Sequence, residues 1–179
     1  MKQFLVSLRG IFIFIGILWI IYFLSLPFPV LKSFGIIPRT THGLIGIMTS
    51  PFLHANFVHL YMNSIGFLTF SIIIFFFYRK KGFDIILIVQ LIGGVLTWIF
   101  GRSANHIGAS GLIFGMYGYL ISHGFYEKNT KSSLITLAVI ILYGPMIYGI
   151  IPQYYSHISW EGHLFSFIGG VAITKYKLT

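Results

Sequence analysis

Long runs of hydrophobic residues alternate with short polar breaks along almost the whole chain. An α-helix needs about 20 apolar residues to cross the hydrocarbon core of a bilayer, and fewer where the bilayer is thin. On this basis we predict membrane-spanning helices at about 9–26, 57–78, 83–101, 110–126, 132–151 and 160–176. No stretch of soluble character separates these runs. The pattern therefore predicts an all-α polytopic membrane protein in which residues 1–179 form one domain of six transmembrane helices.

Polar and turn-forming residues mark the breaks between the runs and irregularities within them. The cluster at 79–82 separates the second run from the third, and Gly144-Pro145 predicts a kink in the fifth. Lys2 and Arg9 precede the first run, as basic residues do in a signal peptide. However, this run is too long and no small-residue cleavage site follows it, so we expect an uncleaved helix.

The number and distribution of charged residues indicate a membrane location and an orientation in the membrane. Charged residues make up only 8% of the chain, whereas a soluble domain carries roughly a quarter. With the N-terminus in the cytoplasm, the basic residues on the cytoplasmic side are Lys2, Arg9, Arg79, Lys80, Lys81, Lys128, Lys131, Lys175 and Lys177. Those outside are Lys32, Arg39 and Arg102. This asymmetry predicts a multi-pass protein of the cell membrane with both termini in the cytoplasm. Because the basic residues form small clusters and no stripe, the net charge of +9 does not indicate nucleic-acid binding.

The first outer connection, at about 27–56, is long and rich in apolar residues. We expect it to form short helices at the membrane interface. Tyr148, Tyr154, Tyr155 and Trp160 are typical of an interfacial aromatic belt, and they could also cap a site. The chain has no Cys, which excludes disulfides, thiol catalysis and metal binding by Cys.

Polar residues at membrane depth are costly, and here they gather at the outer ends of three predicted helices. The run from His54 through His59 to Asn63 leads into the second helix, while Ser110 opens the fourth and His163 lies at the start of the sixth. His59 and Asn63 are four residues apart and share one helix face. Since the second, fourth and sixth helices all start at the outer surface, these side chains are expected at a similar depth.

Each of these residues also has an ordinary structural interpretation. A lone Ser in a membrane helix usually bonds to a carbonyl one turn earlier, and an Asn often links two helices. The functional interpretation gains weight from small residues in the same helices: Gly111 and Gly115 in the fourth, and Gly162, Ser166 and Gly170 in the sixth. Small residues four apart let two helices approach closely, as a Ser–His hydrogen bond requires. We interpret His106 as an interfacial loop residue and assign no role to His123.

In combination, these motifs resemble the rhomboid family of intramembrane serine proteases. The resemblance rests on His-x-x-x-x-His-x-x-x-Asn at 54–63, Gly-x-Ser-Gly at 108–111, and a His in a final helix rich in small residues. It covers nearly the whole chain. It implies a bundle of six helices that cleaves single-span membrane proteins near the outer end of their helices, with the lipid bilayer as its surroundings. It implies no cofactor, no metal and no nucleic acid.

The resemblance also implies roles for individual residues. Ser110 matches the nucleophile and His163 the general base. His59 and Asn63 match the side chains that, with the backbone N–H of Ser110, stabilise the oxyanion. The supporting residues are His54, as a structural histidine, Gly108 and Gly111 beside the nucleophile, and Phe114, which stacks on the base.

Three positions depart from the usual rhomboid pattern. The Trp-Arg pair expected in the first outer loop is replaced by Ile45-Gly46. The aromatic residue that follows the nucleophile is Phe114 where Tyr is usual, so the stacking surface is kept and the hydroxyl is lost. Ser166 stands where a Gly is usual in the last helix.

Two other functions remain as alternatives. One is a non-catalytic rhomboid relative that binds transmembrane helices, and the intact Ser110 and His163 argue against it. The other is a small transporter, for which neither an inverted repeat nor charged residues at mid-membrane are found. Glu161 is the one carboxylate on the outer side, but it lies two residues before His163 and so points to roughly the opposite helix face. We therefore expect a Ser–His dyad without a carboxylate, with Glu161 complementing the helix dipole.

Overall fold

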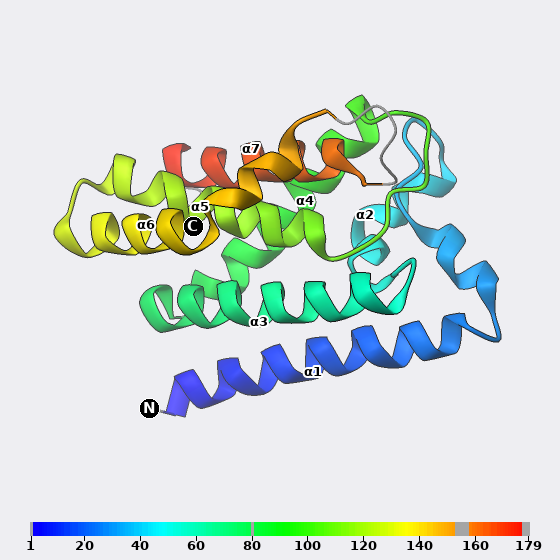
Figure 1. Cartoon of the computed structure of the whole chain (residues 1–179), viewed down its shortest axis with the longest axis horizontal. Coiled ribbons are helices and arrows are strands. Elements are labelled where there is room, and N and C mark those ends of the chain that lie inside the picture. The colour runs from blue at the N-terminus through cyan, green and yellow to red at the C-terminus, as the bar shows by residue number, and fades with distance from the viewer. Residues whose placement is uncertain (1, 80, 153–157, 177–179) are drawn as a thin grey trace.

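The computed structural model describes residues 2–79, 81–152 and 158–176, with side chains from residue 6 onward (Figure 1). Helices account for all the regular elements that these ranges contain, apart from a single bridge between Ile36 and His106. The elements are α1 (Lys2–Ser25), η1 (Pro29–Phe34), η2 (His42–Leu44), α2 (Gly46–Thr49), η3 (Ser50–Phe52), α3 (Phe57–Tyr78), α4 (Lys81–Phe100), α5 (Ser110–Glu127), α6 (Thr130–Tyr143), η4 (Gly144–Ile150) and α7 (Trp160–Tyr176).

Each predicted span is helical, and most boundaries agree to within two residues. The first helix begins earlier than predicted, at Lys2. The fifth changes from an α-helix to a 3₁₀ helix at Gly144, where Pro145 lacks the N–H that an α-helix needs. The expected kink is thus a change of helix type. The predicted short helices of the first outer connection are present as η1, η2, α2 and η3. Tyr154 and Tyr155 lie outside the described residues.

By length and apolar composition, four helices of the described chain could cross a membrane: Val6–Ser25, Phe57–Tyr78, Lys81–Phe100 and Thr130–Ile150. α5 and α7 are not long and apolar enough to be counted among these helices. Both are rich in Gly and polar residues, and α5 is enclosed by other helices along much of its length. A helix with protein on most sides needs little apolar surface of its own. The structure therefore supports a multi-pass membrane protein, and the number of six spans stays a prediction.

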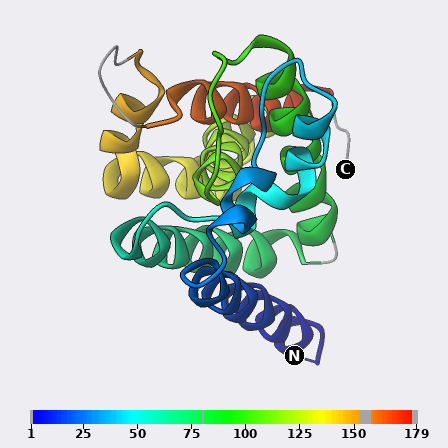
Figure 2. The same ribbon diagram turned by 90° about the vertical axis from the view of Figure 1, so that its right-hand side faces the viewer.

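The long helices run side by side, with α5 near the centre of the bundle (Figures 1 and 2). α7, α4, α6 and α3 surround α5, and α1 lies outside against α3. The bundle core includes Leu60, Phe70, Met116 and Leu120, each fully buried. Large apolar side chains are exposed on the outer faces, for example Phe12 on α1, and such a surface suits lipid tails.

The closest packing in the bundle is between α5 and α7, where the backbones come into direct contact. A Cβ on Gly170 would overlap the carbonyl oxygen of Gly115, and one on Gly118 would overlap that of Phe167. Only glycine permits this distance between helix axes. The contact fixes the start of α5, with Ser110, relative to the start of α7, with His163.

This packing predicts that Gly170→Ala destabilises the protein. The new methyl group would meet backbone atoms, which cannot rotate away as a side chain can. We expect a loss of about 3 kcal/mol, the upper end of the usual cost of overpacking. The midpoint of thermal unfolding in detergent measures it. Gly16→Ala on α1 is the matched control, because its Cβ meets nothing within 4 Å. Equal midpoints for the two variants would contradict the packing argument.

Candidate active site

Ser110 begins α5 directly after the connection 101–109, and Gly108 sets the shape of that connection. Gly108 has φ of +116°, a conformation that side-chain-bearing residues rarely adopt. Its N–H donates to the carbonyl oxygen of Ser50 (2.9 Å), and His106 is paired through its backbone with Ile36. The first outer connection thus holds the chain segment that leads into Ser110.

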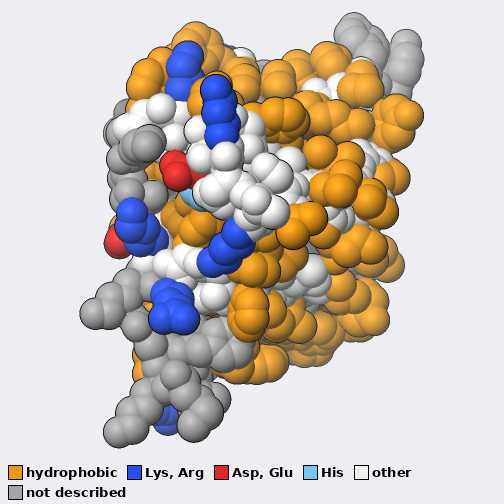
Figure 3. All heavy atoms as spheres, turned by 90° about the vertical axis from the view of Figure 1, so that its left-hand side faces the viewer, with side chains coloured by type: hydrophobic (Ala, Val, Ile, Leu, Met, Phe, Trp, Pro, Cys, Tyr) orange, Lys and Arg blue, Asp and Glu red, His pale blue; other side chains and the backbone are white. Residues whose placement is uncertain are grey.

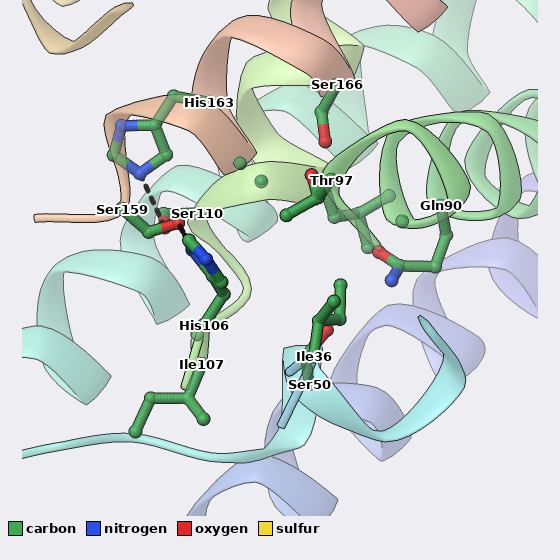
Figure 4. Close-up of a pocket in the computed structure, with 15 residues that line it drawn as sticks. Ile36, Ser50, Gln90, Thr97, His106, Ile107, Ser110, Ser159, His163 and Ser166 are labelled. Carbon is green, nitrogen blue, oxygen red and sulfur yellow. Dashed lines mark hydrogen bonds between the residues drawn. The ribbon is translucent and has the colours of Figure 1, made fainter. Parts of the chain in front are cut away.

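Ser110 and His163 are joined by a hydrogen bond, 2.8 Å from Oγ to Nε2 (Figure 4). They come from different helices and are 53 residues apart in the sequence. His163 is buried, whereas Ser110 remains partly accessible. The two helix starts lie against each other, because a Cβ on Gly111 would be 3.2 Å from Ser166 Oγ and 3.5 Å from the carbonyl oxygen of Gly162. The two residues predicted as nucleophile and base therefore lie in contact.

The second ring nitrogen of His163 also has a partner, the carbonyl oxygen of Gly149 in η4, 3.0 Å from Nδ1. A carbonyl oxygen can only accept, so Nδ1 carries the proton and Nε2 offers its lone pair to the Ser110 hydroxyl. Phe114 stacks on the imidazole, with ring centroids 4.1 Å apart and planes at 8°. The prediction that Phe114 packs on the base agrees with this geometry. The Gly149 carbonyl is an additional support that sequence reasoning missed.

His59 and Asn63 lie on the same face of α3 and against Gly108. A Cβ on Gly108 would come within 2.5 Å of the His59 ring and 3.2 Å of Asn63 Nδ2. Asn63 Nδ2 is buried and has no hydrogen-bond partner among the described residues. The backbone N–H of Ser110 also lacks a partner within its own helix, because Ser110 is the first residue of α5. His59 and Asn63 therefore lie beside the segment that leads into Ser110.

His54 lies behind His59, with the two rings edge to face and their centroids 5.1 Å apart. It is buried in the connection before α3. Burial first, and the nearby His59 second, lower the pKa of His54 to about 3. His54 is therefore neutral at physiological pH, and the structural role predicted for it stays a prediction.

A group of polar contacts, which the sequence did not predict, ties the 101–109 connection to the start of α7. Arg102 Nε lies 3.4 Å from the Oε1 of Glu161, which is buried, and Arg102 Nη2 donates to the carbonyl oxygen of Ile158 (2.8 Å). His106 contacts Ser159 Oγ (2.5 Å) through Nδ1 and the Arg102 carbonyl oxygen (3.0 Å) through Nε2. Glu161 is in the first turn of α7, as expected, but it also forms an ion pair.

His106 was expected at the interface, and the structure corrects this. Its side chain is buried, and burial lowers its pKa. Its Nε2 faces a carbonyl oxygen and so carries the proton, which leaves Nδ1 to accept from the Ser159 hydroxyl. Figure 4 shows this contact next to the Ser110–His163 pair. The connection and α7 are thus joined within a few residues of both members of the pair.

Two hollows adjoin Ser110. A small cavity of about 30 Å³ lies on the inner side and is lined by polar side chains that include Gln90, Thr97 and Ser166 (Figure 4). A larger cleft of about 630 Å³ lies on the other side, between the start of α3, the 101–109 connection and the segment before α7. Among the described residues, no three His, Asp or Glu side chains gather in a way that could hold a metal ion.

Known proteins are similar in sequence to most of this chain. A model of the rhomboid domain family matches residues 41–179. An uncharacterized protein of Mycobacterium tuberculosis is 33% identical over 153 residues, which cover 81% of this chain and 63% of that protein. A protein of Acanthamoeba polyphaga mimivirus named as a rhomboid protein is 31% identical over 139 residues, 74% of each chain. The chain thus spans less than two thirds of its mycobacterial relative.

The family match begins before α3 and includes His54, His59, Asn63, Ser110 and His163. The similarity to the mycobacterial and viral proteins extends over most of the chain. Together with the helical bundle, these findings place the protein: it belongs to the rhomboid family.

Proposed function

We propose that this protein is an intramembrane serine endopeptidase that uses Ser110 as nucleophile and His163 as general base. The observation that carries the proposal is the 2.8 Å hydrogen bond between Ser110 Oγ and His163 Nε2, with Nδ1 held by the Gly149 carbonyl. A nucleophile, an adjacent base and a third group that orients the base are the parts that acyl transfer requires. Here the third group is a backbone carbonyl in place of the usual carboxylate.

In the first half of the reaction, Ser110 Oγ bonds to the carbonyl carbon of the substrate as its proton passes to His163 Nε2. The imidazolium then gives this proton to the leaving nitrogen, the C–N bond breaks, and an acyl ester on Ser110 remains. The Gly149 carbonyl keeps the His163 ring in place while the ring carries the positive charge. Phe114 limits rotation of the ring by stacking on one face.

Stabilisation of the oxyanion falls to the donors beside Gly108. Asn63 Nδ2 and the ring of His59 lie beside Gly108, two residues before Ser110, and we assign them, with the backbone N–H of Ser110, to the substrate carbonyl oxygen that would carry the negative charge. Preorganised donors of this kind contribute roughly 3–4 kcal/mol each to lowering the barrier. Asn63 Nδ2 is buried and has no hydrogen-bond partner among the described residues. It can therefore donate to the oxyanion without first breaking another hydrogen bond.

The second half of the reaction needs water inside a largely apolar bundle. The cavity of about 30 Å³ next to Ser110 is large enough for a water molecule, and its polar lining supplies hydrogen bonds. Such a water would attack the acyl ester, give its proton to His163 Nε2, and the Ser110 hydroxyl would be restored with that proton. This completes peptide-bond hydrolysis without a metal or cofactor.

We infer that the substrates are single-span membrane proteins cut near the outer end of their helices. The larger cleft at Ser110 has apolar walls that include Val58, Met62 and Ile158. A helix hides its own carbonyl groups, so the segment to be cut must unwind to lie in this cleft. The basic residues concentrate at the opposite end of the bundle, and this asymmetry supports a site on the outer side of the cell membrane with both termini in the cytoplasm.

The proposal predicts that Ser110→Ala and His163→Ala each abolish cleavage of a transmembrane substrate by the purified protein. The double variant should be no slower than either single one, because the two residues act as a unit. Product formation on a gel and thermal unfolding should be measured on the same samples. Cleavage by a folded Ser110→Ala variant would show that the assignment of the nucleophile is wrong. If the wild-type protein binds the substrate but never cleaves it, the protein is a non-catalytic binder.

A second prediction concerns the proposed oxyanion donors. Asn63→Ala and His59→Ala should lower kcat by roughly 10- to 1000-fold with a much smaller change in KM, because their contacts form in the transition state. Steady-state kinetics in detergent measures both constants. Ser64→Ala, on the neighbouring face of α3, is the matched control and should keep its kcat. A rise in KM alone would make Asn63 and His59 substrate contacts instead.

A third prediction separates a dyad from a triad. Because His163 Nδ1 bonds to the Gly149 carbonyl, Glu161→Gln should keep most of the activity. A triad carboxylate, in contrast, costs about 10⁴-fold in kcat when it is neutralised. The variant loses the ion pair with Arg102, so its thermal midpoint should fall, and activity must be compared at a temperature where it is folded. A 10⁴-fold loss in the folded variant would contradict the dyad.

A further inference from the structure

A second Ser–His hydrogen bond lies next to the proposed catalytic pair. His106 Nδ1 and Ser159 Oγ are 2.5 Å apart, and Figure 4 shows this bond beside the one between Ser110 and His163. His106 lies four residues before Ser110 in the sequence, and Ser159 lies four residues before His163. The two bonds therefore join the same two chain segments at two points. One bond can act as a pivot, whereas two bonds fix the direction as well as the distance between the segments.

His106 is held firmly on the side of the nucleophile. Its backbone exchanges two hydrogen bonds with Ile36 (2.9 and 3.0 Å), and its Nε2 bonds to the Arg102 carbonyl oxygen (3.0 Å). The side chain is buried. Because Nε2 carries the proton, Nδ1 is left as an acceptor for the Ser159 hydroxyl. The ring is thus a fixed point in the connection that leads into Ser110.

Ser159 occupies the corresponding place on the side of the base. It lies directly before Trp160, the first residue of α7, where a Ser usually turns its oxygen back to the N–H groups of its own helix. Within the described part of the chain, the Ser159 hydroxyl bonds across to His106 instead. Its backbone carbonyl accepts from the N–H of His163 (3.1 Å). A shift of Ser159 is therefore passed directly to the backbone of the proposed base.

Two glycines leave the space that this hydrogen bond occupies. A Cβ on Gly162 would come within 2.7 Å of Ser159 Oγ. On the other side, a Cβ on Gly101 would lie 3.2 Å from His106 Nε2. Any larger residue at either position would press on one member of the pair. Gly162 thus makes room for the Ser159 hydroxyl at the start of α7.

An ion pair joins the same two segments, but it constrains them less. Arg102 Nε lies 3.4 Å from Glu161 Oε1, and the Arg102 side chain is 38% exposed. Exposed ion pairs contribute little, because water screens them and a long side chain must be ordered. The bond between Ser159 and the buried His106 is shorter and involves two short side chains. It is therefore the contact that can determine the geometry of the catalytic pair.

We propose that His106 and Ser159 are positioning residues for the reaction, and that their hydrogen bond sets the place of Ser110 Oγ relative to His163. This role rests on the proposed protease function. A misplacement of about 1 Å at the reacting atoms can cost 10²-fold in rate. Loss of the bond therefore slows the chemical step and leaves substrate binding largely unchanged.

Steady-state kinetics of the full chain in detergent, with a transmembrane substrate, tests the proposal. Ser159→Ala should lower kcat by roughly 10- to 100-fold while KM stays within about two-fold. Ser159→Thr keeps the hydroxyl and should keep most of kcat. Ser122→Ala is the matched control, because the Ser122 hydroxyl also links α5 to α7, through Thr174 Oγ1 (2.9 Å). It does so toward the other end of the bundle, where Lys and Arg side chains gather (Figure 3), and its loss should leave kcat unchanged.

The ¹⁵N resonances of the His163 ring give a second readout that requires no cleavage. They can be assigned by their loss in a His163→Gln variant. In Ser159→Ala the Nε2 resonance should move, because the hydrogen bond to Ser110 weakens. In Ser122→Ala it should stay in place. The thermal midpoints of all variants, measured on the same samples, show that the spectra and rates come from folded protein.

Three results would overturn the proposal. A wild-type kcat in Ser159→Ala, or equal losses of kcat in Ser159→Ala and Ser122→Ala, would reduce the bond to general stabilisation. A rise in KM alone, or a Thr variant as slow as the Ala variant, would mean that the hydroxyl does not position the pair. Unchanged His163 resonances in Ser159→Ala would have the same meaning. A wild-type protein that cleaves nothing would instead refute the proposed function, and the resonances would then decide the positioning role.

Discussion

The direct contact of the α5 and α7 backbones is the constraint on which the rest of the site depends. Gly115 and Gly170 bring the two helices so close that the first residues of both meet at one end. A Ser hydroxyl and a His ring are short, so their hydrogen bond requires that the starts of the two helices lie in contact. The glycines therefore determine the 2.8 Å distance between Ser110 and His163 as much as these two residues do themselves.

Much of this arrangement was predictable because membrane helices leave a strong pattern in sequence. Lipid excludes irregular backbone, so apolar runs and their polar breaks locate the helices to within a few residues. Alternating helix direction then places His59, Asn63, Ser110 and His163 at one level without any knowledge of their contacts. The length of α1 was less predictable, because Lys2 and Arg9 interrupt the apolar pattern at a point where the helix continues.

The supports of the site were harder to predict, because they involve backbone atoms or residues in connections. Every residue has a backbone carbonyl, so the role of the Gly149 carbonyl cannot be recognised from the residue type. Whether this carbonyl faces His163 depends on how η4 folds after Pro145. His106 and Arg102 lie in a segment without periodicity, so neither their burial nor their partners could be read from spacing. The one available signal was Glu161: a carboxylate in an otherwise apolar region needs a cation, and Arg102 is the nearest outer one in sequence.

The hydrogen bond between Gly149 and His163 makes the geometry of the Ser110–His163 pair depend on a part of the chain that belongs to neither α5 nor α7. η4 continues directly from α6, a helix at the edge of the bundle. If this turn is displaced, the ring loses the acceptor that distinguishes its two nitrogens, and the form with hydrogen on Nε2 becomes accessible. That form can donate to Ser110 but cannot deprotonate it. Under the proposed mechanism, displacement of η4 would therefore raise the population of the inactive tautomer and lower turnover, although η4 carries neither Ser110 nor His163.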